Sequence, residues 1–425
     1  MTKILRTAAA VLAGTAVGQA ALSPCPNTAS LLHPYNTAPG WSYIKIADGL
    51  HSPRDLILDS QGRLLIIQQG LGLSQHTVDA NGCITHTRLL ISNADLNHGI
   101  CLSRDGKTLY ASSSESVFSW TYEPSTGNVS HNAATVVSGM ASSDHVTRTL
   151  ITPPHRPDLL VVSRGSNANI DPDAINPSTG RAIVKVFNIS SVPTGGYNFT
   201  SQGWNAGFGL RNEVGLAFDG NNMLWGVENS ADNLVRTANG TTTDIHNDNP
   251  AEELNFLGDV ASPNNNWYGY PVCFTVWNPD ELPGHVFRVG QQFVQAPGPN
   301  FNDDTCADIS IPPILGLQAH SAPLGCKFDA EFGNLFVAMH GSWDRQPPTG
   351  YKVVAVPFAQ GPDGSYAPTA ASWSNRGSID VFYPPNEAQC SSSTCIRPVG
   401  LAFDAFGRLY VTSDASGEVF LLSQA

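Results

Sequence analysis

A strand–turn–strand pattern recurs six times along this chain of 425 residues, and it limits the possible folds more than any other feature. Each copy is an apolar strand, a turn and a second apolar strand, and four of the turns read DSQG, SRDG, DGNN and DAFG. The copies span residues 52–69, 96–113, 148–164, 212–229, 321–340 and 397–414. Six such hairpins, each followed by further strand-like sequence, predict an all-β fold, a six-bladed β-propeller. A pair of β-sandwiches or another β-solenoid is the alternative that the repeat leaves open.

The copies are unevenly spaced, because a long segment rich in Asn, Pro and Gly lies between the fourth and the fifth, at residues 230–320. Long irregular segments in compact folds are usually functional or disordered. This one carries Trp267, Tyr268, Tyr270 and Trp277, so we expect it to be ordered and functional. The absence of a linker or a composition shift predicts one domain over residues 21–425.

Residues 1–20 have the pattern of a secretory signal peptide. Lys3 and Arg6 form a short basic region, an apolar run of small residues follows, and residues 18–20 resemble a cleavage site. The apolar run is too short to span a bilayer, and no later segment could do so. We therefore expect a mature protein that begins near Ala21, is secreted and is soluble outside the cell.

The cysteines and the glycosylation sequons agree with that location. Eight cysteines without any Cys-X-X-Cys motif favour a disulfide framework over metal-binding or catalytic thiols. The one pairing that the spacing predicts is Cys390 with Cys395, across the short CSSSTC loop. Four Asn-X-Ser/Thr sites are candidates for glycosylation, at Asn128, Asn188, Asn198 and Asn239.

The charge balance argues against some classes of partner. The formal net charge is −13, whereas nucleic acids and anionic membranes require a basic surface. Glycine-rich phosphate loops are also absent from the sequence, which argues against a nucleotide ligand.

The loops that enter the first strand of each repeat carry an unusual set of side chains. When the six copies are aligned on the end of that strand, these loops contain Arg54, His98, His145, Arg211 with Asn212, His320 and Arg397. In a propeller such loops lie beside the central channel on one face. Each residue alone could be a surface charge or a packed histidine, but six equivalent positions are harder to explain in that way. A ring of arginines and histidines in an acidic protein predicts an anionic ligand with several carboxylates or phosphates.

Seven motifs, which are specific when taken together, resemble the fungal pyrroloquinoline-quinone-dependent pyranose dehydrogenases. More distantly, they resemble bacterial soluble quinoprotein glucose dehydrogenase and the sorbosone dehydrogenases. The motifs are DHVTRTL (144–150), LRNEVGLAFD (210–219), DNPAEELNFL (248–257), NNNWYGYP (264–271), HSAPLGCKFD (320–329), MHGSWDRQPPTGYKVV (339–354) and RPVGLAFD (397–404). The resemblance covers essentially the whole mature chain. It implies an enzyme that oxidises the anomeric hydroxyl of aldoses and other pyranoses with pyrroloquinoline quinone (PQQ) and Ca²⁺ as cofactors.

The resemblance also implies roles for individual residues. His145 matches the general base that removes the hydroxyl proton of the sugar, a role suited to an imidazole that titrates near neutrality. Arg211 and Asn212 match a pair whose arginine reaches the quinone. Arg397 and Arg54 match contacts to the cofactor carboxylates.

Other expected contacts are less specific. His340 stands where the bacterial enzyme has a lysine and is expected to contact the cofactor, while His320 and Trp343 are expected to face the cofactor plane or the substrate. Trp267 and Trp277 are further candidates for stacking on a sugar, although all three tryptophans are equally compatible with packing. The family binds Ca²⁺ largely through backbone carbonyls, which here correspond to Asp248, Asn249 and Pro250.

The sequence departs from the bacterial pattern in two places. Cys395 replaces an arginine and His340 replaces a lysine, so the expected site is less cationic. Some fungal relatives carry a haem domain and a cellulose-binding module, for which this chain has no corresponding sequence. We therefore expect electrons to pass to a separate acceptor, such as a secreted haem protein or a copper oxygenase.

Two other functions remain open at this point. Six-bladed lactonases are hydrolases that bind calcium on the propeller axis through carboxylates and asparagines, whereas the predicted ring is rich in arginine and histidine. A non-catalytic propeller, such as a lectin, would have no reason to gather Arg54, Arg211 and Arg397 in one channel. The ring therefore favours a dehydrogenase with a polyanionic cofactor.

Overall fold

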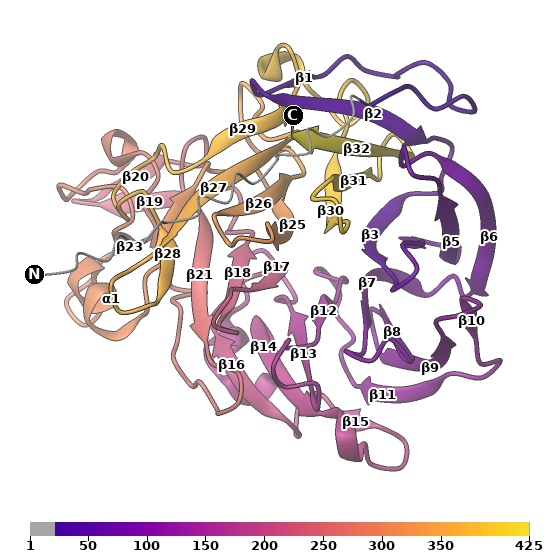
Figure 1. The fold of residues 1–425 in the computed structure, drawn as a ribbon. Helices are drawn as coiled ribbons and strands as arrows, with labels where there is room; N and C mark the ends of the chain where they lie inside the picture. The colour runs from indigo at the N-terminus through magenta and orange to yellow at the C-terminus, as the bar shows by residue number, and fades with distance from the viewer. Residues whose placement is uncertain (1–21, 425) are drawn as a thin grey trace, which may run out of the picture.

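Six antiparallel sheets surround a central axis in the computed structural model, which describes residues 22–424 (Figure 1). This arrangement confirms the predicted all-β, six-bladed propeller. The expected signal peptide, residues 1–20, lies outside the described residues.

The strands of the first three blades follow one another along the chain. Blade 1 consists of β3 (Pro53–Leu58), β4 (Leu64–Gln68), β5 (Gly72–Val78) and β6 (Ile84–Ser92). Blade 2 consists of β7 (Leu96–Leu102), β8 (Thr108–Ser113), β9 (Val117–Glu123) and β11 (Ala134–Ser138), with β10 (Asn128–Val129) and β15 (Tyr197–Asn198) at its edge. Blade 3 consists of β12 (Leu150–Ile151), β13 (Leu159–Arg164), β14 (Ile183–Asn188) and β16 (Trp204–Phe208).

The last two blades also recruit strands from the start of the chain. Blade 4 consists of β17 (Glu213–Phe218), β18 (Leu224–Glu228), β21 (Glu252–Gly258) and β24 (Leu315–Leu317). Blade 5 consists of β25 (Pro323–Phe328), β26 (Asn334–Met339), β27 (Lys352–Gln360), β29 (Ile379–Tyr383) and β1 (Asn36–Thr37), with β28 (Tyr366–Pro368) paired to β27. Blade 6 consists of β30 (Pro398–Phe403), β31 (Leu409–Ser413), β32 (Glu418–Gln424) and β2 (Trp41–Ala47).

Each predicted hairpin forms the two innermost strands of a blade, and aspartates stabilise several of its turns. In blade 1 the Asp59 carboxylate accepts hydrogen bonds from the backbone N–H groups of Gln61 and Arg63. Asp219 and Asp404 accept equivalent bonds in blades 4 and 6. The aspartates that end these strands in the sequence are therefore turn residues that satisfy backbone donors.

The innermost strands approach one another closely around the axis, and glycines make this approach possible. A Cβ atom at Gly99 would lie 2.2 Å from the backbone oxygen of Arg148, and one at Gly325 would lie 2.3 Å from that of Val399. Any larger side chain at these positions would push adjacent blades apart. Glycine at these two positions of the innermost strands therefore allows the centre of the ring to be narrow.

The N-terminal segment closes the ring. β2 pairs with β32, from Trp41 opposite Gln424 to Ala47 opposite Val419, so the first long strand completes the last blade. Figure 1 shows these two strands side by side, at opposite ends of the colour scale. The disulfide between Cys25 and Cys83 ties the same segment to blade 1.

Residues 230–320 are only partly an insertion, which corrects the sequence-based division. β21 and β24 are the outer strands of blade 4. The remainder forms two small hairpins and one helix, which lie together at one side of the ring (Figure 1). These elements are β19 (Val235–Ala238), β20 (Thr241–Asp244), β22 (Cys273–Thr275), β23 (Gln292–Val294) and α1 (Asp303–Ile309). Phe274 of β22 and Phe293 of β23 share a buried core with Leu234 and Ile245, which flank the β19–β20 hairpin, and the disulfide between Cys273 and Cys306 joins α1 to β22.

Short 3₁₀ helices complete the described elements, at Pro172–Ile175, Pro177–Thr179, Ile189–Ser191, Pro279–Glu281 and Glu387–Gln389. The predicted Cys390–Cys395 disulfide is confirmed. The disulfide framework uses six of the eight cysteines, because Cys101 and Cys326 are buried free thiols. Within residues 22–424, no helix is long and apolar enough to cross a membrane.

Candidate functional site

A cavity of about 390 Å³ opens among loops of blades 3 to 6, where the first strand of each blade begins and its second strand ends. Its size is within the usual range for small-ligand sites. Seven of the eleven residues predicted from the sequence line this cavity: His145, Arg211, Asn212, His320, His340, Trp343 and Arg397. Arg54, Asp248, Asn249 and Pro250 are not among the lining residues.

His145 is held in one tautomer by the loop that follows β13. Its Nδ1 lies 3.1 Å from the backbone oxygen of Ser166 and 3.0 Å from the Ser166 hydroxyl, which itself donates to the backbone oxygen of Ala168. Because both oxygens act as acceptors, Nδ1 carries the proton and Nε2 keeps its lone pair. Burial and the nearby charge of Arg211 lower the pKa of His145 to about 4. The imidazole is therefore a neutral proton acceptor at neutral pH.

Gly165 allows this arrangement. A Cβ atom at this position would lie 2.6 Å from the side-chain oxygen of Asn212 and 2.7 Å from Cβ of His145. Asn212 and His145 can therefore lie on either side of the backbone at residue 165, as the predicted site requires.

Arg211 is buried, and each nitrogen of its guanidinium donates hydrogen bonds to other residues of the protein. Nε donates to the backbone oxygen of Asn169, and Nη1 donates to the backbone oxygens of Asn229 and Ser230. Nη2 donates to the side-chain oxygen of Asn169 and, at 3.0 Å, to the Asp232 carboxylate. With every donor engaged, Arg211 organises the wall of the cavity. Its predicted contact with a cofactor would require some of these bonds to rearrange.

Asp414, which was not predicted from the sequence, contacts Arg54 and His340 and is linked through His340 to Arg397. It pairs with Arg54 and accepts a hydrogen bond from Nε2 of His340 at 2.9 Å. Arg397 donates from Nη2 to Nδ1 of His340, so His340 is neutral and protonated on Nε2. Burial opposes the charge on Asp414, but His340 and Arg54 outweigh it and lower the pKa of this carboxyl.

Arg54 and His98 lie deeper than the cavity. His98 is only 2% exposed, and its Nδ1 has no hydrogen-bond partner among the described residues. Burial, followed by the charge of Arg54, lowers the pKa of His98 well below its usual value. Asp414 compensates the charge of Arg54, whose buried Nε has no hydrogen-bond partner among the described residues. Arg397 lines the cavity, and its Nη1 makes no hydrogen bond within residues 22–424.

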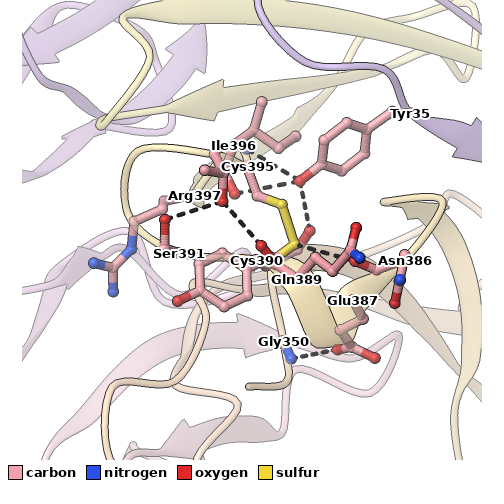
Figure 2. Close-up of a disulfide and its surroundings, with 12 residues drawn as sticks. Tyr35, Gly350, Asn386, Glu387, Gln389, Cys390, Ser391, Cys395, Ile396 and Arg397 are labelled. Atoms are coloured by element: carbon pink, nitrogen blue, oxygen red, sulfur yellow. Dashed lines mark hydrogen bonds between the residues drawn. A yellow bond between two sulfur atoms is a disulfide. The ribbon is translucent and has the colours of Figure 1, made fainter. Parts of the chain in front are cut away.

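Arg397 is fixed by the loop that precedes it. The Cys390–Cys395 disulfide closes this loop, and the backbone N–H of Ile396 donates to the hydroxyl of Tyr35 (Figure 2). Figure 2 also shows the Arg397 side chain pointing away from the disulfide. The disulfide formed by Cys395 therefore helps to restrain Arg397.

A cluster of two aspartates and a histidine lines the same cavity. Asp232, His320 and Asp344 offer ligand atoms that all lie within 4.8 Å of one another. Burial alone would lower the pKa of His320, but the carboxylates of Asp232, Glu252 and Asp344 outweigh it and raise this pKa. His320 also has a φ of 59°, a strained backbone conformation for a residue other than glycine. The three side chains are suited to hold a cation, either a proton on His320 or a metal ion.

The predicted calcium loop lies behind this cluster. The Asp248 carboxylate accepts two hydrogen bonds from Arg345. The backbone oxygen of Asn249 lies 3.3 Å from Nε2 of His320, which places this carbonyl next to the cluster. Whether residues 248–250 ligate calcium stays a prediction, and Asp232 and Asp344 are additional candidate ligands.

The three carboxylates that the sequence did not predict all lie in loops at the same edge of their blades. Asp232, Asp344 and Asp414 lie in the loops that leave β18, β26 and β31, the second strands of blades 4, 5 and 6. In an antiparallel hairpin the start of the first strand and the end of the second lie at the same edge. The signal in the sequence is an acidic residue within five positions of the end of each of these strands.

The three candidate tryptophans have different environments. Trp343 is 68% exposed and lines the cavity, so one face of a planar ligand could stack on it. Trp267 instead donates to the backbone oxygen of Tyr270 and packs against Gly209 within the fold. Trp277 lines a separate cavity beside the first.

Comparison with known proteins identifies the family. Residues 35–425 match the family described as TrAA12-like, and the chain belongs to this family. It is 40% identical over 407 residues, 94% of its length, to a pyrroloquinoline quinone-dependent pyranose dehydrogenase of Coprinopsis cinerea. The chain spans only about half of that relative, 56% of its length.

Two solved structures are closely similar. The holo form of the PQQ domain of the Coprinopsis cinerea pyranose dehydrogenase has a TM-score of 0.92 and 40% identity, and the match covers 94% of this chain and 99% of that one. The calcium structure of the Trichoderma reesei family AA12 protein has a TM-score of 0.88 and 38% identity, with 95% and 100% coverage. The resemblance seen in the sequence motifs is thereby confirmed.

Proposed function

We propose that this protein is a secreted quinoprotein dehydrogenase that oxidises the anomeric hydroxyl of aldoses and other pyranoses, with PQQ and Ca²⁺ as cofactors. Family membership supports the class of reaction. The observation that carries the proposal is the division of charge within one cavity, which is lined both by Arg397 and by the Asp232–His320–Asp344 cluster.

The charge division fits a planar tricarboxylate that is bound together with a cation. Asp414 and Asp232 already compensate Arg54 and Arg211, so the arginines alone provide little attraction for a polyanion. A divalent cation held by Asp232 and Asp344 would supply the missing positive charge. The unpaired Nη1 of Arg397 would bind a carboxylate, and the exposed face of Trp343 would cover the ring system.

The residues around the cavity then have separate tasks. When bound, the quinone supplies the two-electron acceptor of the reaction, and the calcium ion polarises it. His145 receives the hydroxyl proton of the sugar on Nε2, while Ser166 keeps the ring in the required tautomer. Asn212 lines the same wall and can orient the substrate by hydrogen bonding.

The wider context of the reaction follows from the same proposal. The disulfides favour an oxidising compartment, in agreement with the signal-like sequence at residues 1–20. The electrons would leave for an external acceptor, such as a secreted haem protein or a copper oxygenase. The lactonase alternative shares the need for a cation but leaves the Arg397–His340–Asp414 network without a task.

A titration tests the proposal directly. Purified protein is treated with a chelator and then titrated with PQQ, with and without Ca²⁺, while the absorbance of the cofactor is followed. We expect calcium-dependent binding and then bleaching of the bound cofactor by one or more aldoses in a panel. If micromolar PQQ does not bind in the presence of calcium, the proposal is wrong, and sugar lactones become the substrates to test.

A further inference from the structure

His145, the proposed base, lies on a loop that no strand supports. This loop spans residues 139–149, between β11 of blade 2 and β12 of blade 3. Among the described residues, its backbone bonds to other backbone groups only at its two ends, through the N–H of Met140 and the oxygen of Thr149. Buried backbone groups need hydrogen-bond partners, so side chains must supply them in the middle of this loop.

The side chain of Arg148 supplies three of these bonds. Nη1 donates to the backbone oxygens of His145 and Thr147, and Nη2 donates to that of Met140. The imidazole of His145 is held separately, by the contacts of its Nδ1 with Ser166. The base is therefore fixed at two points, its side chain at Ser166 and its backbone at Arg148.

The burial of Arg148 carries a cost in stability. Its side chain is fully buried, and within residues 22–424 it forms no ion pair and its Nε has no hydrogen-bond partner. Burial, followed by the charge of Arg164, lowers the pKa of Arg148 to about 9. A hydrophobic side chain of similar length would avoid the cost of an unpaired buried charge. Stability alone therefore does not explain an arginine at this position.

The backbone of Arg148 is itself held at the centre of the propeller. Its oxygen accepts a hydrogen bond from the hydroxyl of Ser112 in β8, and the same hydroxyl accepts the N–H of Gly99 in β7. β7 and β8 are the two innermost strands of blade 2. The guanidinium thus reaches back three residues to the base from a point that is anchored to a neighbouring blade.

The other charged groups around His145 do not fix its position. Asp144 lies on the same loop, with its carboxylate 3.9 Å from Nδ1, while Arg211 and Asp232 act on the imidazole through their charges from the start of β17 and the end of β18. Among the described residues, none of the three forms a hydrogen bond with the ring. The tautomer of His145 therefore depends on Ser166, and the contact with Ser166 depends on where the loop lies.

We propose that Arg148 is a positioning residue, which keeps the imidazole of His145 against Ser166 with the proton on Nδ1 and the lone pair on Nε2. The inference rests on the proposed function for the role of His145 as the base, although the placement of the ring does not. Without the guanidinium, three carbonyl oxygens of the loop lose their donor and the loop relaxes. The tautomer protonated on Nε2, which cannot accept the proton of a substrate on that atom, then becomes populated.

Nitrogen NMR of the cofactor-free protein measures this tautomer directly. Protein with isotope-labelled histidine is recorded at pH 7, and the His145 signals are assigned from their loss in His145→Gln. We expect the Nδ1–H tautomer in the wild-type protein and its loss in Arg148→Met. Lys185→Met is the matched control, because Lys185 is also a buried cation of blade 3 and donates only to the backbone oxygens of Phe199 and Thr200. We expect this control to keep the wild-type tautomer.

Steady-state kinetics of the holoenzyme give the second readout, with the aldose that bleaches the bound PQQ fastest. We expect Arg148→Met to lower kcat by about ten- to a hundredfold and to leave KM nearly unchanged, since the base is displaced but the cavity remains. Arg148→Lys keeps the charge but lacks the fork that reaches several carbonyls, so its kcat should lie between the other two. If Arg148→Met does not fold, Arg148→Lys decides the question, because its kcat and its Nδ1–H population should both be below those of the wild-type protein.

The two readouts separate this inference from the proposed function. If the Arg148 variants keep the wild-type tautomer and kcat, or if Lys185→Met changes both as much as Arg148→Met does, the positioning role is wrong. If the holoprotein oxidises no sugar but the tautomer depends on Arg148, the positioning role stands and the dehydrogenase assignment fails. A changed tautomer with an unchanged kcat would likewise leave Arg148 as the positioning residue and would overturn His145 as the base.

Discussion

Asp414 provides the sharpest test of how the site is assembled. Its side chain is 12% exposed and is the shared partner of Arg54 and His340. Asp414→Ala leaves the buried Arg54 without a counter-charge, and breaking a buried ion pair in this way costs about 3–5 kcal/mol. We therefore expect the free energy of unfolding of the cofactor-free protein to fall by about this amount in urea titrations at pH 7. Asp414→Asn keeps a hydrogen-bond acceptor and should have an intermediate effect.

The pH dependence gives this prediction a second signature. The pKa of the Asp414 carboxyl is lower in the folded protein than in the unfolded chain, so its stabilising effect is present above the ordinary pKa of aspartate. The difference in stability between the wild-type protein and Asp414→Ala should be constant from about pH 8 to pH 5 and should shrink as the pH falls further.

A surface ion pair serves as the control for this prediction. Asp380 lies 3.1 Å from Lys352, but its side chain is 45% exposed. We expect Asp380→Ala to cost less than about 1 kcal/mol. If Asp414→Ala is no more destabilising than Asp380→Ala, the network around Asp414 does not hold the site together and the reasoning is refuted.

Three other predictions follow from the site. Because the pKa of His145 is lowered to about 4, kcat/KM should stay level as the pH falls from 7 to about 5 and should decrease near pH 4. A decrease of kcat/KM that begins near pH 6.5 would contradict the assignment of His145 as the base. Calcium should raise the melting temperature of the cofactor-free protein, and Asp344→Asn should abolish that rise, whereas an equal rise in both proteins would exclude Asp344 as a ligand. Replacing Cys390 and Cys395 together by serine should lower the free energy of unfolding by about 2 kcal/mol, from the closure entropy of a short loop. The same double variant should bind PQQ more weakly, because the loop restrains Arg397, and unchanged affinity would show that the restraint is unnecessary.

The fold could be predicted because its repeat is local. Each inner hairpin has its own apolar strands and its own turn residues, such as Asp59 and Asp219, so six copies can be recognised one at a time. The strand that closes the ring could not be predicted in this way. β2 pairs with β32 across most of the chain, and nothing in its own sequence indicates that partner. β24 was missed for a different reason, because three residues are too few to form a recognisable pattern.

The sequence predicted where the site lies, but it did not predict which of its charged side chains are paired with one another. Strand alignment placed His145, Arg211 and Arg397 in one channel, and they line one cavity. Compensation of charge depends instead on contacts between loops of different blades. The pair formed by Arg54 and Asp414 joins residues 360 positions apart, which no local pattern reveals. A count of cations in the sequence therefore overestimates the attraction of the site for an anion.

The pairing of β2 with β32 also has a consequence for the order of events during folding. Blade 6 carries Arg397, which lines the proposed cofactor cavity, and Asp414 behind it, so this cavity is incomplete until the first long strand has joined the last one. A ligand that binds only the closed ring shifts the equilibrium away from every open form, to an extent set by its concentration relative to its Kd. Loss of the cofactor and opening of the seam between β2 and β32 should therefore be coupled. Hydrogen exchange along that seam would then report whether the pocket is filled.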